Sequence, residues 1–128
     1  MISLGSVNPT TALSQELIGT SVSLVGKSAI TVGVVTSGLA DGSSAKVYFQ
    51  GAIGNVWFDI ACLAFTTGSV TKDETIVAGA VSAAITRGSG ALTDNTAVQG
   101  CVPDMVRAIV TTTGTYTAGS VAAYYTAY

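Results

Sequence analysis

AKVYFQGAIGNVWFDIACLAF, residues 45–65, is the stretch that decides the fold. Its two apolar halves flank Gly54 and Asn55, residue types that tolerate positive φ and therefore favour a tight hairpin turn. The first half alternates apolar and polar residues, which predicts a strand with one face on a core. The second half is apolar in both phases except at Asp59. That pattern predicts a strand covered on both faces, or one with its second face on a partner subunit.

The rest of the chain repeats this pattern of short apolar segments separated by Gly, Asn, Asp and Pro, which is typical of a β-sandwich or barrel. Loops are expected at 68–74, which holds the only charge cluster, and at 87–95. We therefore predict an all-β protein, an antiparallel β-sandwich or jelly roll of about eight strands with an irregular N-terminal arm. The strands are expected at 21–25, 29–35, 45–53, 56–65, 75–81, 82–86, 105–112 and 120–128.

The N-terminal residues are the least regular part of the chain. Asn8 and Pro9 end a short alternating run, and residues 11–18 fit either a short helix or an extended segment. We therefore divide the chain into an N-terminal arm at 1–19, a candidate docking or swapping segment, and a β-sandwich domain at 20–128. The arm has neither a basic n-region nor an apolar h-region, so no secretory signal peptide is expected.

The composition excludes several classes of function. Charged residues make up 9% of the chain, against about 25% in typical soluble domains. Five Lys and Arg against seven Asp and Glu cannot supply the basic field that binds nucleic acid. The chain has no His, so its Ser and Thr residues lack a His base, and we expect no catalytic residues and no enzyme activity. A surface this poor in charge is instead expected to be covered in part by a partner.

No metal site and no cofactor are expected. Asp73 and Glu74 are the only adjacent carboxylates, and a solvated loop explains them better than a weak Ca²⁺ contact does. Cys62 falls in a strand pattern, in phase with Ile60, and is interpreted as a small buried apolar residue. Reduced Cys62 and Cys101 are favoured over a disulfide, because the chain has no CxxC motif and no export signal.

The longest run without a charge, residues 108–128, contains many hydroxyls and central glycines. It therefore favours two strands around a turn over a membrane span. Its end is crowded with tyrosines, which fits either a protein interface or sheet pairing within the chain. The candidate interface residues are these tyrosines and the large apolar residues of the arm: Ile2, Leu4, Leu13, Leu17, Tyr124, Tyr125 and Tyr128.

Two aromatic pairs lie on the strands of the 45–65 hairpin and should be cross-strand neighbours. They are Tyr48 with Phe49 and Trp57 with Phe58. Packing in the core is the ordinary role of such pairs. A platform that stacks on carbohydrate is the functional alternative, and it requires Trp57 to be accessible.

Two segments resemble parts of small head proteins of tailed bacteriophages. Residues 46–67, KVYFQGAIGNVWFDIACLAFTT, resemble a hairpin with the pattern G-x-x-x-x-x-W followed by an apolar strand that ends in Thr. Residues 104–126, DMVRAIVTTTGTYTAGSVAAYYT, resemble a closing hairpin with an aliphatic-Arg pair, VTTTGT, a Gly-Ser turn and an aromatic-rich last strand. The family is that of the capsid decoration or cement proteins of jelly-roll or β-sandwich type.

The resemblance implies a structural virion protein without enzyme activity. It implies a homodimer or homotrimer that binds the major capsid protein on the outer surface of the virion, after assembly in the host cytoplasm. A surface that is rich in hydroxyls, poor in charge and equipped with strand edges suits such contacts. The alternatives are a fibre, tail or pilus subunit, for which an exported form should carry a signal peptide and a disulfide, and a carbohydrate-binding β-sandwich that depends on Trp57.

Overall fold

Two antiparallel β-sheets make up the part of the chain that the computed structural model describes, residues 1–79 and 83–128. The strands are β1 (Ile2–Val7), β2 (Glu16–Ser23), β3 (Ala29–Ala40), β4 (Ser44–Ile53), β5 (Val56–Phe65), β6 (Thr71–Val77), β7 (Thr96–Ala97), β8 (Met105–Thr113) and β9 (Ala118–Ala127). One sheet has the order β1-β9-β3-β6 and the other the order β2-β8-β4-β5-β7. The predicted all-β sandwich is confirmed, with nine strands in the described residues and no helix among them.

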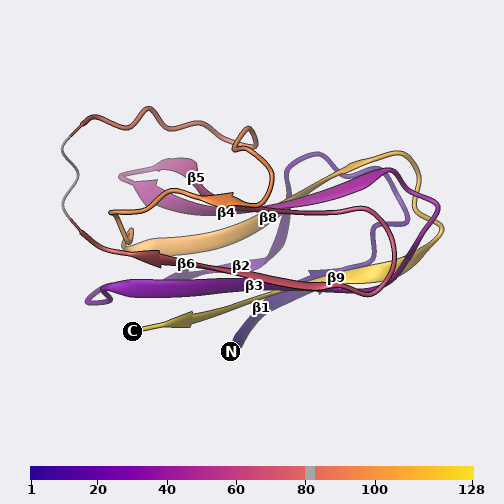
Figure 1. Ribbon diagram of the computed structural model, residues 1–128, viewed down its shortest axis with the longest axis horizontal. Helices are drawn as coiled ribbons and strands as arrows, with labels where there is room; N and C mark the ends of the chain where they lie inside the picture. The colour runs from indigo at the N-terminus through magenta and orange to yellow at the C-terminus, as the bar shows by residue number, and fades with distance from the viewer. Residues whose placement is uncertain (80–82) are drawn as a thin grey trace.

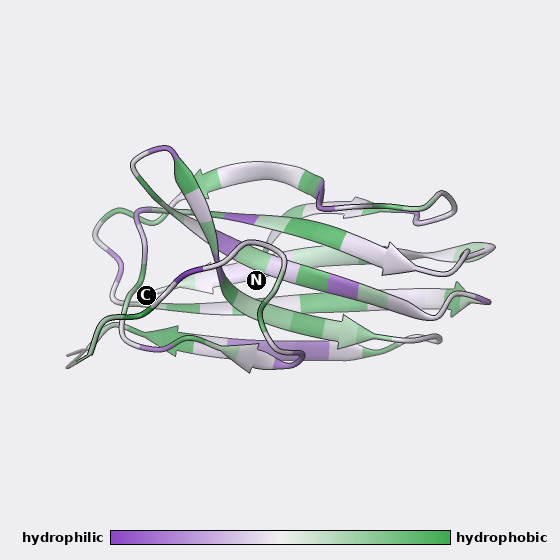
Figure 2. Ribbon diagram, turned by 90° about the horizontal axis from the view of Figure 1, so that it is seen from above, coloured by the Kyte–Doolittle hydropathy of each residue, from purple (hydrophilic) through white to green (hydrophobic). Residues whose placement is uncertain are grey.

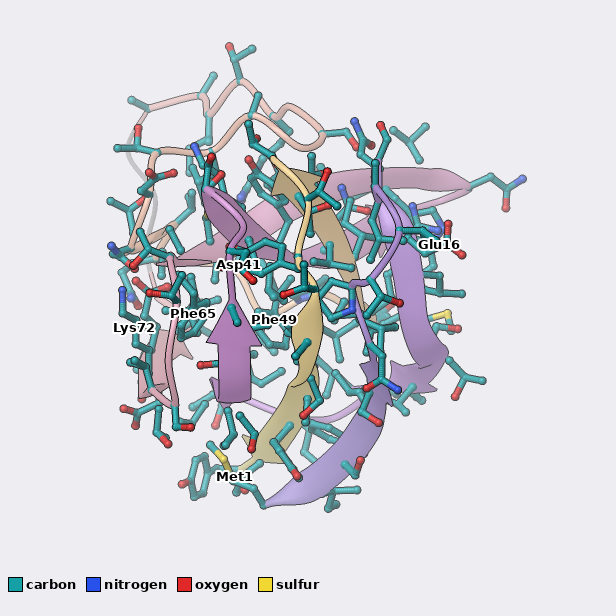
Figure 3. The ribbon with its side chains drawn as sticks, turned by 90° about the vertical axis from the view of Figure 1, so that its right-hand side faces the viewer. Met1, Glu16, Asp41, Phe49, Phe65 and Lys72 are labelled. Atoms are coloured by element: carbon teal, nitrogen blue, oxygen red, sulfur yellow. The ribbon has the colours of Figure 1, made fainter. Side chains whose placement is uncertain are left out.

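The two sheets lie face to face as two layers (Figure 1). Apolar and polar residues alternate along many of the strands (Figure 2), because successive side chains of a strand point to opposite faces. The inner faces form one hydrophobic core, seen end-on with Phe49 at its centre (Figure 3). Its members include Ile30, Val32 and Val34 of β3, Val47 and Phe49 of β4, Val106, Ala108 and Val110 of β8, and Val121 and Ala123 of β9.

The hairpin predicted at 45–65 is confirmed, but its two aromatic pairs are not cross-strand neighbours. The two-residue turn places Trp57 and Phe58 opposite Ala52 and Gly51, and it places Tyr48 and Phe49 opposite Cys62 and Ala61. β4 and β5 pair continuously down to the turn, where Gly54 adopts a φ of 61° that favours glycine. A bulge opposite Phe49 shifts the phase of β5, so that Ile60 and Ala61 both face the core. Cys62 is therefore not in phase with Ile60, although the alternation in the sequence predicts that it is. It is buried in a second, small apolar cluster on the outer face of the sheet.

The first nineteen residues are built into both sheets. β1 pairs with β9 and β2 pairs with β8, so each is an edge strand of its own sheet. The chain crosses from one sheet to the other through residues 8–15. The boundary expected between residues 19 and 20 falls inside β2, and the segment before it supplies two core residues, Leu4 and Ile18.

Two glycines let β1 and β2 approach each other closely. Gly19 has a φ of 69°, and a Cβ atom on it would lie 1.6 Å from the carbonyl oxygen of Leu4. A Cβ atom on Gly5 would lie 2.8 Å from the Cα atom of Gly19. No residue with a side chain fits either position without a shift of the backbone, so the glycines fix how the two edge strands cross.

The expected charged loop at 68–74 is wrong in its second half, because residues 71–77 form the edge strand β6. Lys72 and Glu74 are half-buried and alternate with the exposed Asp73. Strand pairing to β3 and access to solvent at the sheet edge together let this charged sequence form a strand.

Several predicted strand boundaries also differ from the structure. β3 continues past the predicted end at residue 35 to Ala40, with an irregular register after Ser37. The strands expected at 75–81 and 82–86 run over residues 80–82, which lie outside the described residues, and residues 83–86 are not in a strand. These segments lack the strict alternation that marks β4 and β8.

The loop between β8 and β9 carries a core residue that sequence periodicity could not reveal. Tyr116 is buried, and its hydroxyl group donates a hydrogen bond of 2.6 Å to the carbonyl oxygen of Thr66. Its ring packs over Gly42, where a Cβ atom would lie 2.2 Å from the ring. Tyr116 thus closes one end of the space between the sheets, and burial raises its pKa.

Candidate interaction surfaces

The described residues hold no cluster of three or more His, Cys, Asp or Glu that could bind a metal ion. Nor does any helix in them have the length and apolar character needed to span a membrane. Cys62 and Cys101 are both free, and burial raises the pKa of the Cys62 thiol to about 11, so little of it is thiolate at neutral pH. The features that stand out are two sides of the sandwich and one groove.

On one side, a side chain occupies the outer edge of β6. The Oε1 atom of Gln99 accepts a hydrogen bond of 2.9 Å from the Val77 N–H, and its Nε2 atom donates one of 2.6 Å to the Thr75 carbonyl oxygen. Gln99 thereby takes the place that a neighbouring strand would have. An added strand would have to displace it.

The adjacent edge of β5 is occupied in the same way. β7 pairs with β5, and before it the Oδ1 atom of Asn95 accepts a hydrogen bond of 3.1 Å from the Ala64 N–H. The Nζ atom of Lys72 reaches across from β6 and donates to the Ala64 carbonyl oxygen at 2.5 Å and to Asn95 Oδ1 at 3.1 Å. We call the outer edges of β5 and β6 with these caps the closed side.

The opposite side of the sandwich ends in β1 and β2. In the described residues, each of these strands has a paired strand on one side only, and no side chain caps the outer edge of either. Glu16 is the single charged residue in the two strands. Lys72 and Glu16 mark the two opposite sides in Figure 3. We call the outer edges of β1 and β2 the open side.

The structure distributes the predicted interface residues unevenly. Ile2 is 59% exposed and Leu17 is 44% exposed, and both lie on the open side. Leu4 is buried in the core, so it packs within this chain, and Leu13 is half-buried beside β8.

The tyrosines of β9 lie next to β1. Tyr125 is paired with Ile2 and is half-buried against the core, and Tyr124 is paired with Ser3 on the outer face. Tyr128 is 63% exposed, but its N–H donates a hydrogen bond of 2.9 Å to the Ala29 carbonyl oxygen. The structure therefore joins part of the arm and part of the tyrosine cluster at one sheet edge.

Residues 87–95, which we call the strap, cover the outer face of the sheet that contains β5 (Figure 1). The carboxylate of Asp59 holds the strap by accepting backbone N–H groups of Gly90 at 2.9 Å, Ala91 at 2.9 Å and Leu92 at 3.1 Å. Such charge-assisted bonds are stronger than neutral ones. One buried carboxylate therefore anchors a loop that has no strand pairing of its own.

A buried amide connects this anchor to the sheet. Gln50 donates from Nε2 to Asp59 Oδ1 at 3.0 Å and to Ser89 Oγ at 2.8 Å. Its Oε1 atom accepts from Arg107 Nε at 3.1 Å and Nη2 at 3.0 Å. The Arg107 guanidinium lies 4.3 Å from the centre of the Trp57 ring, and desolvation lowers its pKa. The sequence signal for this network was the lone Asp59 in an apolar strand, but its partners could not be identified from spacing.

The remainder of the strap explains why β5 is apolar in both phases. Leu92 packs on the outer cluster formed by Tyr48, Cys62 and Ile109. Asp94 forms an ion pair of 2.9 Å with Lys46, which raises the lysine's pKa. The sequence left two possible covers for the second face of β5, this chain or a partner subunit. In the structure the strap of the same chain covers it.

A groove of about 460 Å³ lies between the tip of the β4–β5 hairpin and the start of the strap. Its walls are Ile53, Val56, Trp57, Phe58 and residues 87–89. Core packing is confirmed for Phe49 and Phe58 but is wrong for Trp57, which is half-buried outside the core cluster. Trp57 is held on the outer face because the β5 register sends it there, beside Arg107.

In comparisons with known proteins, the chain matches no family model, no curated protein and no solved structure. These comparisons therefore assign no family function to the fold or to its surfaces. Their role has to be interpreted from their own residues.

Proposed function

We propose that this chain is a structural subunit that assembles through its open side, and that it serves as a capsid decoration protein on a bacteriophage head. In this proposal it binds the major capsid protein on the outer surface of the virion and also contacts copies of itself as a dimer or trimer. The observation that carries the proposal is the contrast between one side whose strand edges are capped and one whose edges are free.

Free strand edges are surfaces on which another strand can form backbone hydrogen bonds. Monomeric proteins normally protect such edges with charges, bulges or covering segments. Here the closed side has inward-facing charges and side-chain caps, whereas β1 has no charged residue and a single register shift, between Ser3 and Gly5. Low charge also reduces repulsion among the many copies that a capsid surface would hold.

Self-assembly is tested by the mass of the purified protein in solution, measured by light scattering on a size-exclusion column. We expect a compact dimer or trimer. Ile2→Lys places a charge on the free edge of β1 and should shift the protein to monomer. Thr71→Lys adds the same charge to the exposed part of β6 on the closed side and should leave the mass unchanged. A wild-type monomer contradicts the proposal, and open-ended polymers favour the fibre or pilus subunit.

Capsid binding is tested separately, by sedimentation of the protein with capsids assembled from the major capsid protein of the same virus. We expect saturable binding that strengthens the capsid against heat, and weaker binding by Ile2→Lys than by Thr71→Lys. Self-association without any binding to capsids would keep the assembly surface and reject the decoration role.

A further inference from the structure

Arg87 places an incompletely bonded cation at the groove beside the β4–β5 hairpin. Its guanidinium lies 4.8 Å from the centre of the Phe58 ring, and its Nη1 atom is buried without a hydrogen-bond partner in the described residues. A buried charged donor without a partner destabilises the fold, because it has lost its water and gained no acceptor in exchange. Arg87 is half-buried and lines the groove, so an anion there would pair with its guanidinium.

No carboxylate of the described chain fills that place. The ion pair found among the described residues joins Lys46 to Asp94, away from the groove. Asp59 lies under the same strap, but its two oxygens already accept three backbone N–H groups and the Gln50 amide. The positive charge of Arg87 is therefore available to a ligand from outside.

The remaining wall of the groove is aliphatic and accessible. Ile53 and Val56, at the tip of the hairpin, are each 67% exposed, and the half-buried Trp57 stands beside them. Exposed large aliphatic residues on both sides of a turn are suited to contact with an apolar side chain. The groove thus combines one cation with an apolar surface.

We propose that this groove binds an extended acidic peptide segment from a partner protein, in which an Asp or Glu side chain lies next to an aliphatic residue. The carboxylate pairs with the Arg87 guanidinium, and the aliphatic side chain packs on Ile53 and Val56. A guanidinium is well suited to this role, because its planar donors match the geometry of a carboxylate.

The walls favour a peptide over an acidic sugar. Sugar hydroxyls need several polar partners, but the Gln50 amide and the Asp59 carboxylate below the strap are committed to bonds within the chain. Arg107 also stacks on the Trp57 ring, where a sugar would otherwise lie. Aliphatic side chains at the rim match a peptide's apolar residues.

The test uses the only tryptophan of the chain, Trp57, as a reporter in fluorescence and in NMR through its indole N–H. The probe is the blocked tripeptide acetyl-Leu-Asp-Leu-amide, and acetyl-Leu-Asn-Leu-amide is its neutral match. We expect saturable shifts at Trp57 with at least tenfold tighter binding of the Asp peptide, and weaker binding as salt rises. Equal binding of the two peptides, or no saturable shift, would overturn the proposal.

The variants identify the cation. Arg87→Met retains an apolar chain over Phe58 and should abolish the preference for Asp over Asn. Lys27→Met removes the same charge at an exposed turn and should retain the preference. If Arg87→Met does not fold, Val56→Asp puts a negative charge on an exposed wall and should remove the preference without disturbing the core. Sodium glucuronate is the sugar arm, and binding as tight as that of the Asp peptide would reject the peptide assignment.

The residues that line this groove include none of β1 or β2, so its test is independent of the proposed assembly. Binding of the Asp peptide by a monomeric protein would support the groove and contradict the assembly. An oligomer without peptide binding would give the opposite result.

Discussion

β6 and β1 are both edge strands of the same sheet, yet their outer edges differ in kind. At β6, Gln99 and Lys72 form hydrogen bonds across the edge, and inward-facing charges interrupt the apolar face. At β1, the strand ISLGSV has no charge and its outer edge has no cap in the described residues. One edge is protected against an added strand, and the other is suited to accept one.

The protection of β5 and β6 comes from segments that are distant from them in the sequence. The caps of β5 and β6 include Asn95, the last residue of the strap, and Gln99, which follows it, and the strap itself is anchored by Asp59. The open side has no comparable segment, because the chain passes directly from β1 to β2 through residues 8–15. Substitutions on each side in turn test how the strand edges are protected.

The largest effect is expected from Gly19→Ala on the open side. The added Cβ atom would clash with the Leu4 carbonyl oxygen, and the φ of 69° adds strain for a residue with a side chain. We expect a loss of about 3–5 kcal/mol in the free energy of unfolding, measured by urea denaturation. Gly26→Ala is the control, because Gly26 has a φ of 81° but no atom within 4 Å of its Cβ position.

Gly26→Ala should cost about 1–2 kcal/mol, which is the strain alone. If the two variants lost the same free energy, β1 and β2 would not cross as closely as the structure places them.

The next effect is expected from Asp59→Asn, which dismantles the anchor of the strap. The amide oxygen can replace one acceptor, but the amide nitrogen faces N–H groups that then have no partner. We expect a loss of about 2–3 kcal/mol in stability and faster hydrogen exchange at the amides of residues 90–92. Asp94→Asn, which removes only a surface ion pair, should change the stability far less and leave those amides protected.

The elements that were predicted from the sequence are those whose pattern is local. β4, β5 and β8 were found nearly to the residue, because a two-residue turn and strict alternation are properties of neighbouring positions. Gly54 and Asn55 predict the hairpin turn, but the aromatic neighbours predicted across it are wrong, because the register places Tyr48 opposite Cys62 and Trp57 opposite Ala52.

The elements that were missed depend on contacts between distant residues. β6 looks like a charged loop until its pairing with β3 is known, and Tyr116 looks like a loop residue until it is seen between the sheets. Asp59 is the only charged residue in an apolar strand, but the strap that it anchors lies about thirty residues later. The free and capped edges likewise depend on strand order, which periodicity does not encode.

A smaller effect is expected from Gln99→Ala, which removes the cap of β6. Two hydrogen bonds at an exposed edge contribute about 1 kcal/mol, so the loss in stability should be of that order. The informative result is the solution mass, because uncapping should create a second edge that can pair. We expect larger assemblies of Gln99→Ala than of wild type, and an unchanged mass would mean that the remaining inward charges protect β6 without the cap.

The smallest effect is expected from Glu74→Gln, which tests those inward charges. Burial raises the pKa of Glu74, with Lys72 partly opposing the shift, and its Oε2 atom is buried without a hydrogen-bond partner. Because the folded-state pKa lies above the unfolded one, the ionised carboxylate destabilises the fold. This penalty is absent at pH values below the unfolded pKa of about 4.3 and is complete above the folded pKa.

Glu74→Gln should therefore be slightly more stable than wild type at pH 7 and equal to it at pH 3, in parallel urea titrations at the two pH values. The gain in stability should come with a gain in self-association, since an inward charge that weakens an edge strand also discourages further pairing. A variant less stable than wild type at pH 7 would show that Lys72 compensates the carboxylate in full. The charges on β6 would then stabilise the closed side as well as protect it.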